Sequence, residues 1–515
     1  MIGLVREQII GRTLGASRQA DLYFASFTLP DFLNYLLAAG ALSIVFIPIF
    51  LEHHGRDGNE RAWQAFSATA NFVAAACGVG IAILMVFARP LAELVAPGFT
   101  GPGELDTLAR LVRIILPAQF FLVIGGLLSA ALQAQDRHLL PALAPLVYSA
   151  GIIAGGLIGE RLGWGAEGFA WGVLFGSAIG PFALPLCGCM WNNMRWSPIF
   201  SPRNPDLRRY LRLSFPIMIG FSIVVVDEWI IKNQASYLAE GSLAYLQYAR
   251  TLMKVPIGVF GMAAGVASYP TVSRMVAAGS VVEAYAVLSR AVRLMLLVTF
   301  AAQIVFTLCG FELIYLIWGF LSHRFTVADA QATASVLAFL CFGLGGWAAQ
   351  TVVSRGYYAL GDTWLPTLVG TAVAFGAIPI YILLRHAWGA IGLASASGVA
   401  ILIYVFLLGW LQYRRFAREA AKRGATLDRV PGMLDATVRL SLAAAVSIVA
   451  GLAIRGFVLE YLPGTDLAPL LARTALLSFV GIGIFAGLAA LLGVRELSEL
   501  KAFLARELRE HVSQH

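Results

Sequence analysis

The chain carries Trp164-Gly165-Ala166-Glu167-Gly168 and, 224 positions later, Trp388-Gly389-Ala390-Ile391-Gly392. A second pair of segments repeats at nearly the same spacing, because Leu140-Pro141-Ala142-Leu143 returns after 225 positions as Leu365-Pro366-Thr367-Leu368. Offsets that agree so closely at separate places indicate an internal duplication. In a membrane protein, such a duplication is typical of transporters, in which two lobes surround a central binding site.

The composition indicates that the solvent for most of this chain is lipid. Of its 515 residues, 59% are hydrophobic and only 13% are charged, and the mean hydropathy is +0.77. A run of about 20 apolar residues crosses a bilayer as a helix, whereas an open strand edge cannot satisfy its hydrogen bonds in lipid. The apolar runs predict an all-α integral membrane protein with thirteen full spans, at 23–51, 63–88, 111–133, 140–159, 166–191, 213–237, 243–269, 284–309, 331–353, 364–384, 389–411, 436–459 and 469–493.

The odd number of spans has an explanation in the repeat. The second repeat begins with a whole helix at 213–237, whereas the first offers only the segment from Gly3 to about Leu14 in the equivalent place. We therefore expect that the first helix is truncated here and that residues upstream of Met1 complete a fourteenth span. The segment lacks the long apolar stretch and cleavage site of a signal peptide.

The basic residues predict the orientation in the membrane. If the loop at 52–62 is cytoplasmic and the loops alternate, the cytoplasmic loops and the tail hold 23 Lys and Arg, and the opposite loops hold 10. This asymmetry is what the positive-inside rule expects. It also accounts for the net charge of +8 without nucleic acid as a partner, because the basic residues are scattered among short loops.

Several charged residues fall inside predicted spans. The 213–237 helix contains Asp227, Glu228 and Lys232, and the next helix contains Arg250 and Lys254, four residues apart on one face. A charge at the bilayer centre costs about 2.5–3.5 kcal/mol by insertion scales, so it normally faces a wet cavity. One interpretation is that Asp227 or Glu228 only neutralises Arg250 or Lys254. The other is a cationic central cavity for an anionic substrate, which also uses basic residues of the first lobe: Arg6, Arg12 and Arg18.

Other motifs are weak or absent. Asp21 is expected either to bridge to Arg18 or to cap a helix. Cys77, Cys187, Cys189, Cys309 and Cys341 fall within predicted helices, and we expect them to be buried rather than metal ligands. The sequence contains no nucleotide-binding glycine fingerprint, nucleophile elbow or HExxH motif.

Blocks in a fixed order resemble a known family. They are Arg6-Glu7, Ala20-Asp21-Leu22-Tyr23-Phe24, Leu29-Pro30-Asp31, Gly40-Ala41-Leu42-Ser43, Phe46-Ile47-Pro48, Ala96-Pro97-Gly98-Phe99, the segments 137–145 and 255–270, and Gly356-Tyr357-Tyr358 with Asp362 and Pro366. Over nearly its whole length, the chain resembles the MurJ/MviN family of lipid II flippases, within the multidrug/oligosaccharidyl-lipid/polysaccharide exporter superfamily.

The resemblance implies fourteen helices: an N-lobe at 1–200, a C-lobe at 206–425 and two more helices at 430–495, followed by a cytoplasmic tail at 496–515. It implies a non-enzymatic flippase of the bacterial inner membrane that serves peptidoglycan synthesis and cell shape. Its partners would be lipid II, membrane lipids and cell-wall synthesis proteins. The C-terminal helices would hold the polyprenyl tail, and alternating access would carry the diphosphate-sugar head group across the membrane.

We expect Arg6, Arg250, Lys254, Asp21 and Arg18 to bind the substrate, and Asp227, Glu228 and Lys232 to balance charge or couple an ion. No cofactor is expected apart from a monovalent cation at Asp227, although polar partners for it are missing near 377–381. Two alternatives stay open. One is a flippase or exporter of another polyprenyl-diphosphate oligosaccharide or amphiphile, and the other is a membrane glycosyltransferase or ligase.

Overall fold

The computed structural model describes residues 2–38, 41–56, 59–199, 203–219, 223–320, 322–427, 433–494 and 496–497, and within these ranges it contains helices and connecting segments without a β-strand. The chain divides into two compact units. Unit 1 comprises residues 1–244 and 321–326, and unit 2 comprises residues 245–320 and 327–515. The predicted lobe limits near 200 and 206 stay a prediction, because this division follows packing and leaves the helices up to residue 235 in unit 1.

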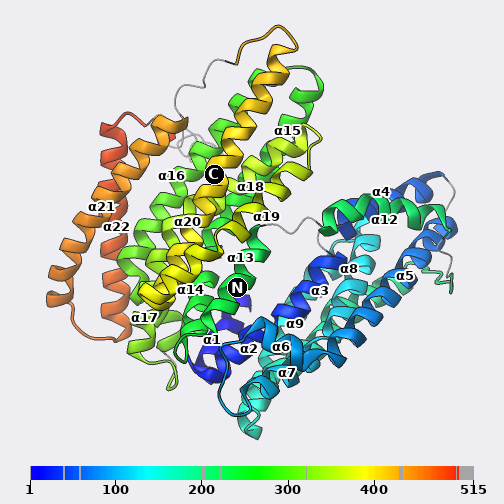
Figure 1. Ribbon diagram of the computed structural model, residues 1–515, viewed down its shortest axis with the longest axis horizontal. Coiled ribbons are helices and arrows are strands. Elements are labelled where there is room, and N and C mark those ends of the chain that lie inside the picture. The colour runs from blue at the N-terminus through cyan, green and yellow to red at the C-terminus, as the bar shows by residue number, and fades with distance from the viewer. Residues whose placement is uncertain are drawn as a thin grey trace, which may run out of the picture. The chain divides into compact units, whose positions relative to one another are not determined.

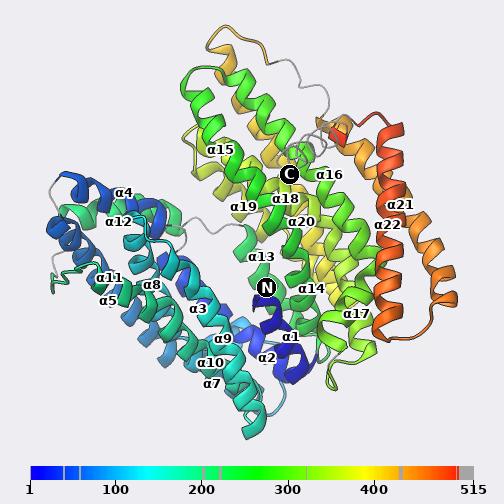
Figure 2. The ribbon, with the colours of Figure 1, turned by 180° about the vertical axis from the view of Figure 1, so that it is seen from behind.

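Unit 1 is a bundle of helices (Figures 1 and 2). Its helices are α1 (Ile2–Leu14), α2 (Arg18–Ser26), α3 (Thr28–Ala38), α4 (Ala41–Arg56), α5 (Asn59–Val86), α6 (Ala88–Val95), α7 (Glu104–Ile115), α8 (Ala118–Ala134), α9 (Leu139–Leu162), α10 (Ala166–Ser177), the π-helix η1 (Ala178–Ala183), α11 (Leu184–Trp191), α12 (Pro205–Ile219) and α13 (Ile223–Ala235).

Unit 2 continues from α14 (Ser242–Pro256), whose first turn belongs to unit 1. It further contains the π-helix η2 (Ile257–Gly261), α15 (Met262–Ala277), α16 (Val281–Ile314), the π-helix η3 (Tyr315–Gly319), α17 (Val327–Leu340), the 3₁₀-helix η4 (Cys341–Gly343), α18 (Leu344–Ala359), α19 (Trp364–Gly376), α20 (Ile378–Ala421), α21 (Met433–Tyr461) and α22 (Leu467–Leu491).

Nine helices among the described residues are long and apolar enough to cross a membrane, and they coincide with nine of the thirteen predicted spans. The other four predicted spans are not among these nine. In the 23–51 run a turn at Phe27 separates α2 from α3, whereas residues 39–40 of this run and residues 220–222 of the 213–237 run lie outside the described residues. The 243–269 run contains the π-helix η2 directly after Pro256, and the 364–384 run breaks between α19 and α20. Hydropathy detects apolar length but not such breaks.

The backbone confirms the repeat at the motif that revealed it. Gly165 has φ 54° and ψ −123°, and Gly389, its counterpart, has φ 58° and ψ −129°. This conformation is essentially restricted to glycine. Gly165 directly precedes α10, and Gly389 interrupts α20, so the long α20 consists of two helical segments that meet at this residue.

Glycines also set the closest helix packing in unit 1. A Cβ on Gly155 would lie 2.5 Å from the Cα of Gly172, and one on Gly159 would lie 2.6 Å from the Cα of Gly168. Small residues allow membrane helices to approach this closely. The glycines therefore allow the backbones of α9 and α10 to pack directly against each other.

A buried charge cluster holds the C-terminal helices to the rest of unit 2. Glu312 of α16 is fully buried and accepts two hydrogen bonds from Arg455 of α21, at 2.8 and 3.0 Å. Arg473 of α22 lies 3.5 Å from the same carboxylate and donates to the carbonyls of Leu462 and Gly464 in the connecting loop. One carboxylate thus joins three helices.

One minor expectation was wrong. Cys77, Cys189, Cys309 and Cys341 are buried, but Cys187 is exposed. Cys187 lies in α11, two positions from Cys189, and side chains two positions apart point in directions about 200° apart around a helix, so the two thiols face different sides.

Candidate functional site

Arg6 lies in α1 of unit 1 and keeps 28% of its side-chain surface exposed. Its Nη2 and Nε donate to Oε1 of the adjacent Glu7, at 2.7 and 3.2 Å. Tyr23 and Tyr148 are close enough to interact with its charge. Arg6 is therefore accessible to an anion, although a neighbouring carboxylate balances part of its charge.

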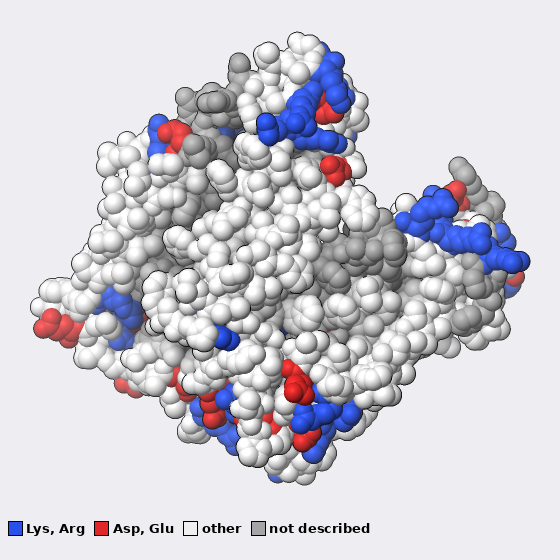
Figure 3. Space-filling view, viewed as in Figure 1, with Lys and Arg blue, Asp and Glu red and all other residues white. Residues whose placement is uncertain are grey.

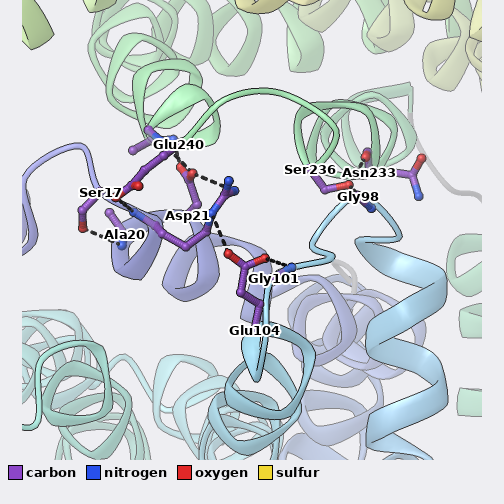
Figure 4. A network of polar contacts seen from close by, with 12 residues as sticks. Ser17, Ala20, Asp21, Gly98, Gly101, Glu104, Asn233, Ser236 and Glu240 are labelled. Atoms are coloured by element: carbon purple, nitrogen blue, oxygen red, sulfur yellow. Dashed lines mark hydrogen bonds and ion pairs between the residues drawn. The ribbon is translucent and has the colours of Figure 1, made fainter.

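Asp21 is fully buried, and it caps a helix distant in the sequence. Its two carboxylate oxygens accept the backbone N–H groups of Gly241, at 2.8 Å, and of Ala244 in the first turn of α14, at 2.9 Å (Figure 4). A carboxylate is favourable at a helix N-terminus because it satisfies free N–H groups and opposes the positive end of the helix dipole. Asp21 precedes the first predicted span, and burial raises the pKa of its carboxyl to about 7, outweighing the lowering effect of these N–H groups and of Arg18.

Glu240, which lies just before α14, in turn caps the start of α2. Its Oε1 accepts the backbone N–H of Arg18, the first residue of α2, at 2.8 Å. Arg18 and Glu240 are 222 positions apart, which is close to the repeat offset. The segments that begin α2 and α14 are therefore repeat-related and cap each other reciprocally.

The side chain of Arg18 is held by its surroundings. Its Nη1 lies 3.4 Å from Asp21 Oδ2, and its Nε lies 3.1 Å from Glu104 Oε1. Its guanidinium also stacks over the ring of Phe99, 5.0 Å from the centroid. The expected bridge between Asp21 and Arg18 is present, and two carboxylates balance the charge of Arg18.

A second set of bonds ties the segment after α13 to the loop between α6 and α7. The N–H of Gly98 donates to Ser236 Oγ at 3.0 Å (Figure 4). Asn233 Nδ2 donates to the carbonyls of Leu94 and Val95 at 3.1 and 3.2 Å. A Cβ on Gly98 would lie 2.4 Å from the backbone of Ser236, so the close approach requires glycine. We call the residues of both sets of contacts the outward network, because they lie in or next to loops on the predicted outer side of the membrane. The outward network comprises Ser17, Arg18, Asp21, Gly98, Glu104, Asn233, Ser236 and Glu240.

The charged residues of α13 are packed within unit 1. Asp227 is buried, and Glu228 is partly exposed. Lys232 is buried as well, and its Nζ lies 3.9 Å from Asp31 Oδ2 of α3. The carboxylate beside Lys232 thus belongs to Asp31 of α3 and not to a residue of α13, the helix that contains Lys232.

Arg250 lies deep in unit 2, with 4% of its surface exposed. Its Nη2 is 3.5 Å from Ser397 Oγ of α20, and its guanidinium lies 5.9 Å from the ring centroid of Trp347 in α18. The indole N–H of Trp347 is buried and has no hydrogen-bond partner. Lys254, one helical turn after Arg250, is exposed. The structure thus groups Arg250 with an aromatic face, a hydroxyl and an unused N–H donor.

The structure separates the predicted residues into three groups. Arg18 and Asp21 meet in the outward network, Lys232 meets Asp31, and Arg250 meets Trp347 and Ser397. Sequence reasoning missed Glu7, Glu104 and Glu240 as partners of arginines. Glu240 could have been found from its offset of 222 from Arg18. No group of three or more potential ligands that could hold a metal ion occurs among the residues that the structure describes.

Comparison with known proteins identifies the family. The family model for the lipid II flippase MurJ matches residues 10–471. The chain belongs to the MurJ family. A probable lipid II flippase MurJ of Thermotoga maritima is 27% identical over 500 residues, covering 97% of this chain and 94% of the relative. The lipid II flippase MurJ of Burkholderia cenocepacia is 27% identical over 377 residues, covering 72% of each chain.

Solved structures support the same fold. A MurJ lipid II flippase in an inward closed conformation aligns with a TM-score of 0.73 at 19% identity, covering 95% of this chain and 96% of that one. An inward-facing multidrug resistance MATE transporter of the MOP superfamily aligns with a TM-score of 0.69 at 15% identity, covering 81% and 95%. This chain is therefore a multi-pass membrane protein with the helical fold that the MurJ family shares with MATE transporters.

Proposed function

We propose that this protein moves lipid II, the lipid-linked precursor of peptidoglycan, across the bacterial cytoplasmic membrane. The observation that carries the proposal is the match of the MurJ family model over residues 10–471, supported by relatives named as lipid II flippases along nearly the whole chain. The chemistry of the chain is compatible with it. A polyprenyl tail can stay in lipid while a charged head group crosses, and this requires basic side chains at membrane depth.

Arg250 is the residue that we assign first to the diphosphate. A guanidinium can bind a phosphate through two parallel hydrogen bonds, and Trp347 and Ser397 orient this one from two other helices. Lys254 follows on the same face and is exposed, so it can contribute a second positive charge. Arg6 is accessible in unit 1 and is assigned the same attraction for anions.

We assign a different role to Arg18 and Asp21. Their charges are used within the outward network, where Asp21 holds the start of α14 and Glu240 holds the start of α2. Alternating access requires helices to exchange between two arrangements. The reciprocal caps are contacts that such an exchange can break and re-form without disturbing the helices themselves. Transport of this kind breaks no covalent bond in the cargo, so no catalytic residue is proposed.

Genetic complementation tests the proposal. The full chain is expressed in a bacterium whose own lipid II flippase can be depleted, and growth is followed after depletion. We expect the chain to sustain growth and normal cell shape. Lysis despite verified membrane insertion would contradict lipid II transport and favour another polyprenyl-diphosphate oligosaccharide as the cargo, or the membrane glycosyltransferase or ligase.

A further inference from the structure

One ridge of α20 changes from apolar to basic along its length. Leu402, Phe406, Trp410, Arg414 and Arg418 follow one another at intervals of four residues, and all five are exposed. Residues four apart lie on the same side of a helix, about 40° apart around its axis, so over these five positions the ridge winds part of the way around α20. The side of the helix opposite Arg414 and Arg418 is buried, where Phe416 packs on the ring of Tyr285 in α16, with centroids 5.4 Å apart. The basic end of the ridge therefore faces outward from unit 2.

The length of α20 places the change at the membrane surface. From the break at Gly389 the helix runs for 33 residues to Ala421, whereas about 20 residues suffice to cross the hydrocarbon core. Counted from Gly389, the core ends near Gly409, so Trp410 falls at the boundary. Phe406, 73% exposed, lies on the hydrocarbon side, and Arg414 lies one turn beyond Trp410. Tryptophan is enriched at this boundary.

The two arginines of the ridge differ from their basic neighbours. Arg415 lies 3.8 Å from Asp362, and Lys422 lies 2.8 Å from Glu419. Within the described part of the chain, Arg414 and Arg418 make no ion pair with a carboxylate. Arg414 stacks instead on Trp410, with its guanidinium carbon 4.5 Å from the ring centroid. Its position is thus fixed by an aromatic ring, while its guanidinium makes no hydrogen bond to the residues that the structure describes.

We propose that Arg414 and Arg418 bind the phosphate of an anionic phospholipid in the cytoplasmic leaflet. This leaflet follows from the distribution of basic residues, which makes this end of α20 cytoplasmic. Guanidinium groups bind phosphate oxygens in pairs, and the acyl chains would lie along Phe406 and Leu402. Figure 3 shows the basic cluster over this end of α20, next to a wide surface without charges. The proposal goes beyond the transported substrate and does not depend on it.

Lipid binding to the purified full-length protein tests this site. The protein in a neutral detergent is titrated with phosphatidylglycerol, and bound lipids are counted by native mass spectrometry. Each basic residue near an anionic membrane surface contributes on the order of 1 kcal/mol, so Arg414→Gln/Arg418→Gln should weaken binding by roughly 25-fold. The matched control is Arg415→Gln/Lys422→Gln, which removes the same charge from residues that already have partners, and it should bind like the unchanged protein.

Two further measurements distinguish binding of an anionic lipid from binding of other compounds that contain phosphate. Phosphatidylcholine, which has a phosphate but no net charge, should bind equally to both variants. Inorganic pyrophosphate should not displace phosphatidylglycerol, because it lacks acyl chains. Equal losses in the two double variants would overturn the proposal in favour of general surface charge. Unchanged binding in Arg414→Gln/Arg418→Gln, or displacement by pyrophosphate, would overturn it as well.

Discussion

At the scale of single residues, Arg250 is the side chain on which the transport proposal depends most. It is buried, and an aromatic ring and a hydroxyl lie beside its guanidinium. We expect Arg250→Ala to abolish complementation of the depleted strain while membrane levels stay normal. Arg250→Lys keeps the charge but loses the paired donors, so it should support only slow growth. Growth and immunoblots of membranes provide the measurement.

The matched control for Arg250 is Arg423→Ala, since Arg423 is exposed and its guanidinium donates to a backbone carbonyl, that of Val276. It should complement like the unchanged chain. Full growth with Arg250→Ala would remove the diphosphate role of this residue.

The raised pKa of Asp21 predicts a pH-dependent outward network. Burial raises the pKa of this carboxyl from 3.8 to about 7, whereas a released, hydrated Asp21 would return to its ordinary value. The capped state therefore binds a proton that the released state lacks, and capping weakens as the pH rises from about 4 to 7, by at most about tenfold per pH unit. Above pH 7 the effect levels off.

Labelling of the cysteine in a Ser236→Cys variant measures the opening of the outward network, because Ser236 is buried within it. The labelling rate is compared at pH 5.5 and pH 7.5 with that of the same cysteine in an Asp21→Asn background, which cannot titrate. We expect the labelling rate in the protein with Asp21, divided by the rate in the Asp21→Asn background, to be higher at pH 7.5 than at pH 5.5. A ratio independent of pH would show that Asp21 does not control the release.

The residue scale also shows what the sequence alone could predict. Asp21 was expected to bridge to Arg18 or to cap a helix, and it does both, but the capped helix begins 221 residues later in the sequence. Helical spacing alone would pair Lys232 with Glu228, four residues earlier in α13, whereas in the structure Lys232 lies 3.9 Å from Asp31 of α3. Spacing within one helix is visible in a sequence, whereas contacts between helices depend on packing.

At the scale of helices, the duplicated glycine motif makes a paired prediction. Gly165 and Gly389 share a conformation that costs other residues about 1–3 kcal/mol. Gly165→Ala and Gly389→Ala should each lower the midpoint of thermal unfolding in detergent. Gly409→Ala is the control, because a Cβ there meets open space within a regular helix. Equal midpoints for Gly389→Ala and Gly409→Ala would contradict the strain argument.

The charge cluster of the C-terminal helices makes a second prediction at this scale. Removing the shared carboxylate by Glu312→Ala leaves two arginines, Arg455 and Arg473, beside each other without compensation. Breaking a buried pair in this way costs about 3–5 kcal/mol. We expect early loss of α21 and α22 from the bundle, detected as increased hydrogen exchange of both helices. Glu460→Ala, at an exposed position of α21, should leave the exchange unchanged.

The helices were more predictable than their interruptions. Apolar length is a property of composition, so the ranges of α5, α16, α21 and α22 follow closely from the sequence. The π-helix after Pro256 and the turn at Phe27 between α2 and α3 depend on local hydrogen bonding and on packing against neighbours. A hydropathy window averages over many residues and therefore shows neither of these local features.

At the scale of the whole molecule, two observations converge. The repeat predicted a transporter built from duplicated helices, and the match of the MurJ family model over residues 10–471 assigns the chain to a family of that kind. The fold agrees, with a TM-score of 0.73 to a MurJ structure at 19% identity. The family match does not by itself assign roles to the charged residues of this chain. The central claim is that Arg250, Lys254 and Arg6 bind the diphosphate of the transported lipid.

Transport of lipid II by the purified protein in vesicles tests that claim most directly. Vesicles contain fluorescent lipid II, and a membrane-impermeant reagent modifies only the head groups exposed outside. We expect the unchanged chain to bring the protected lipid II to the reagent, and the Arg250→Ala variant to leave about half of it protected, as in vesicles without protein. Protection that is the same with the unchanged chain as in protein-free vesicles would contradict the account.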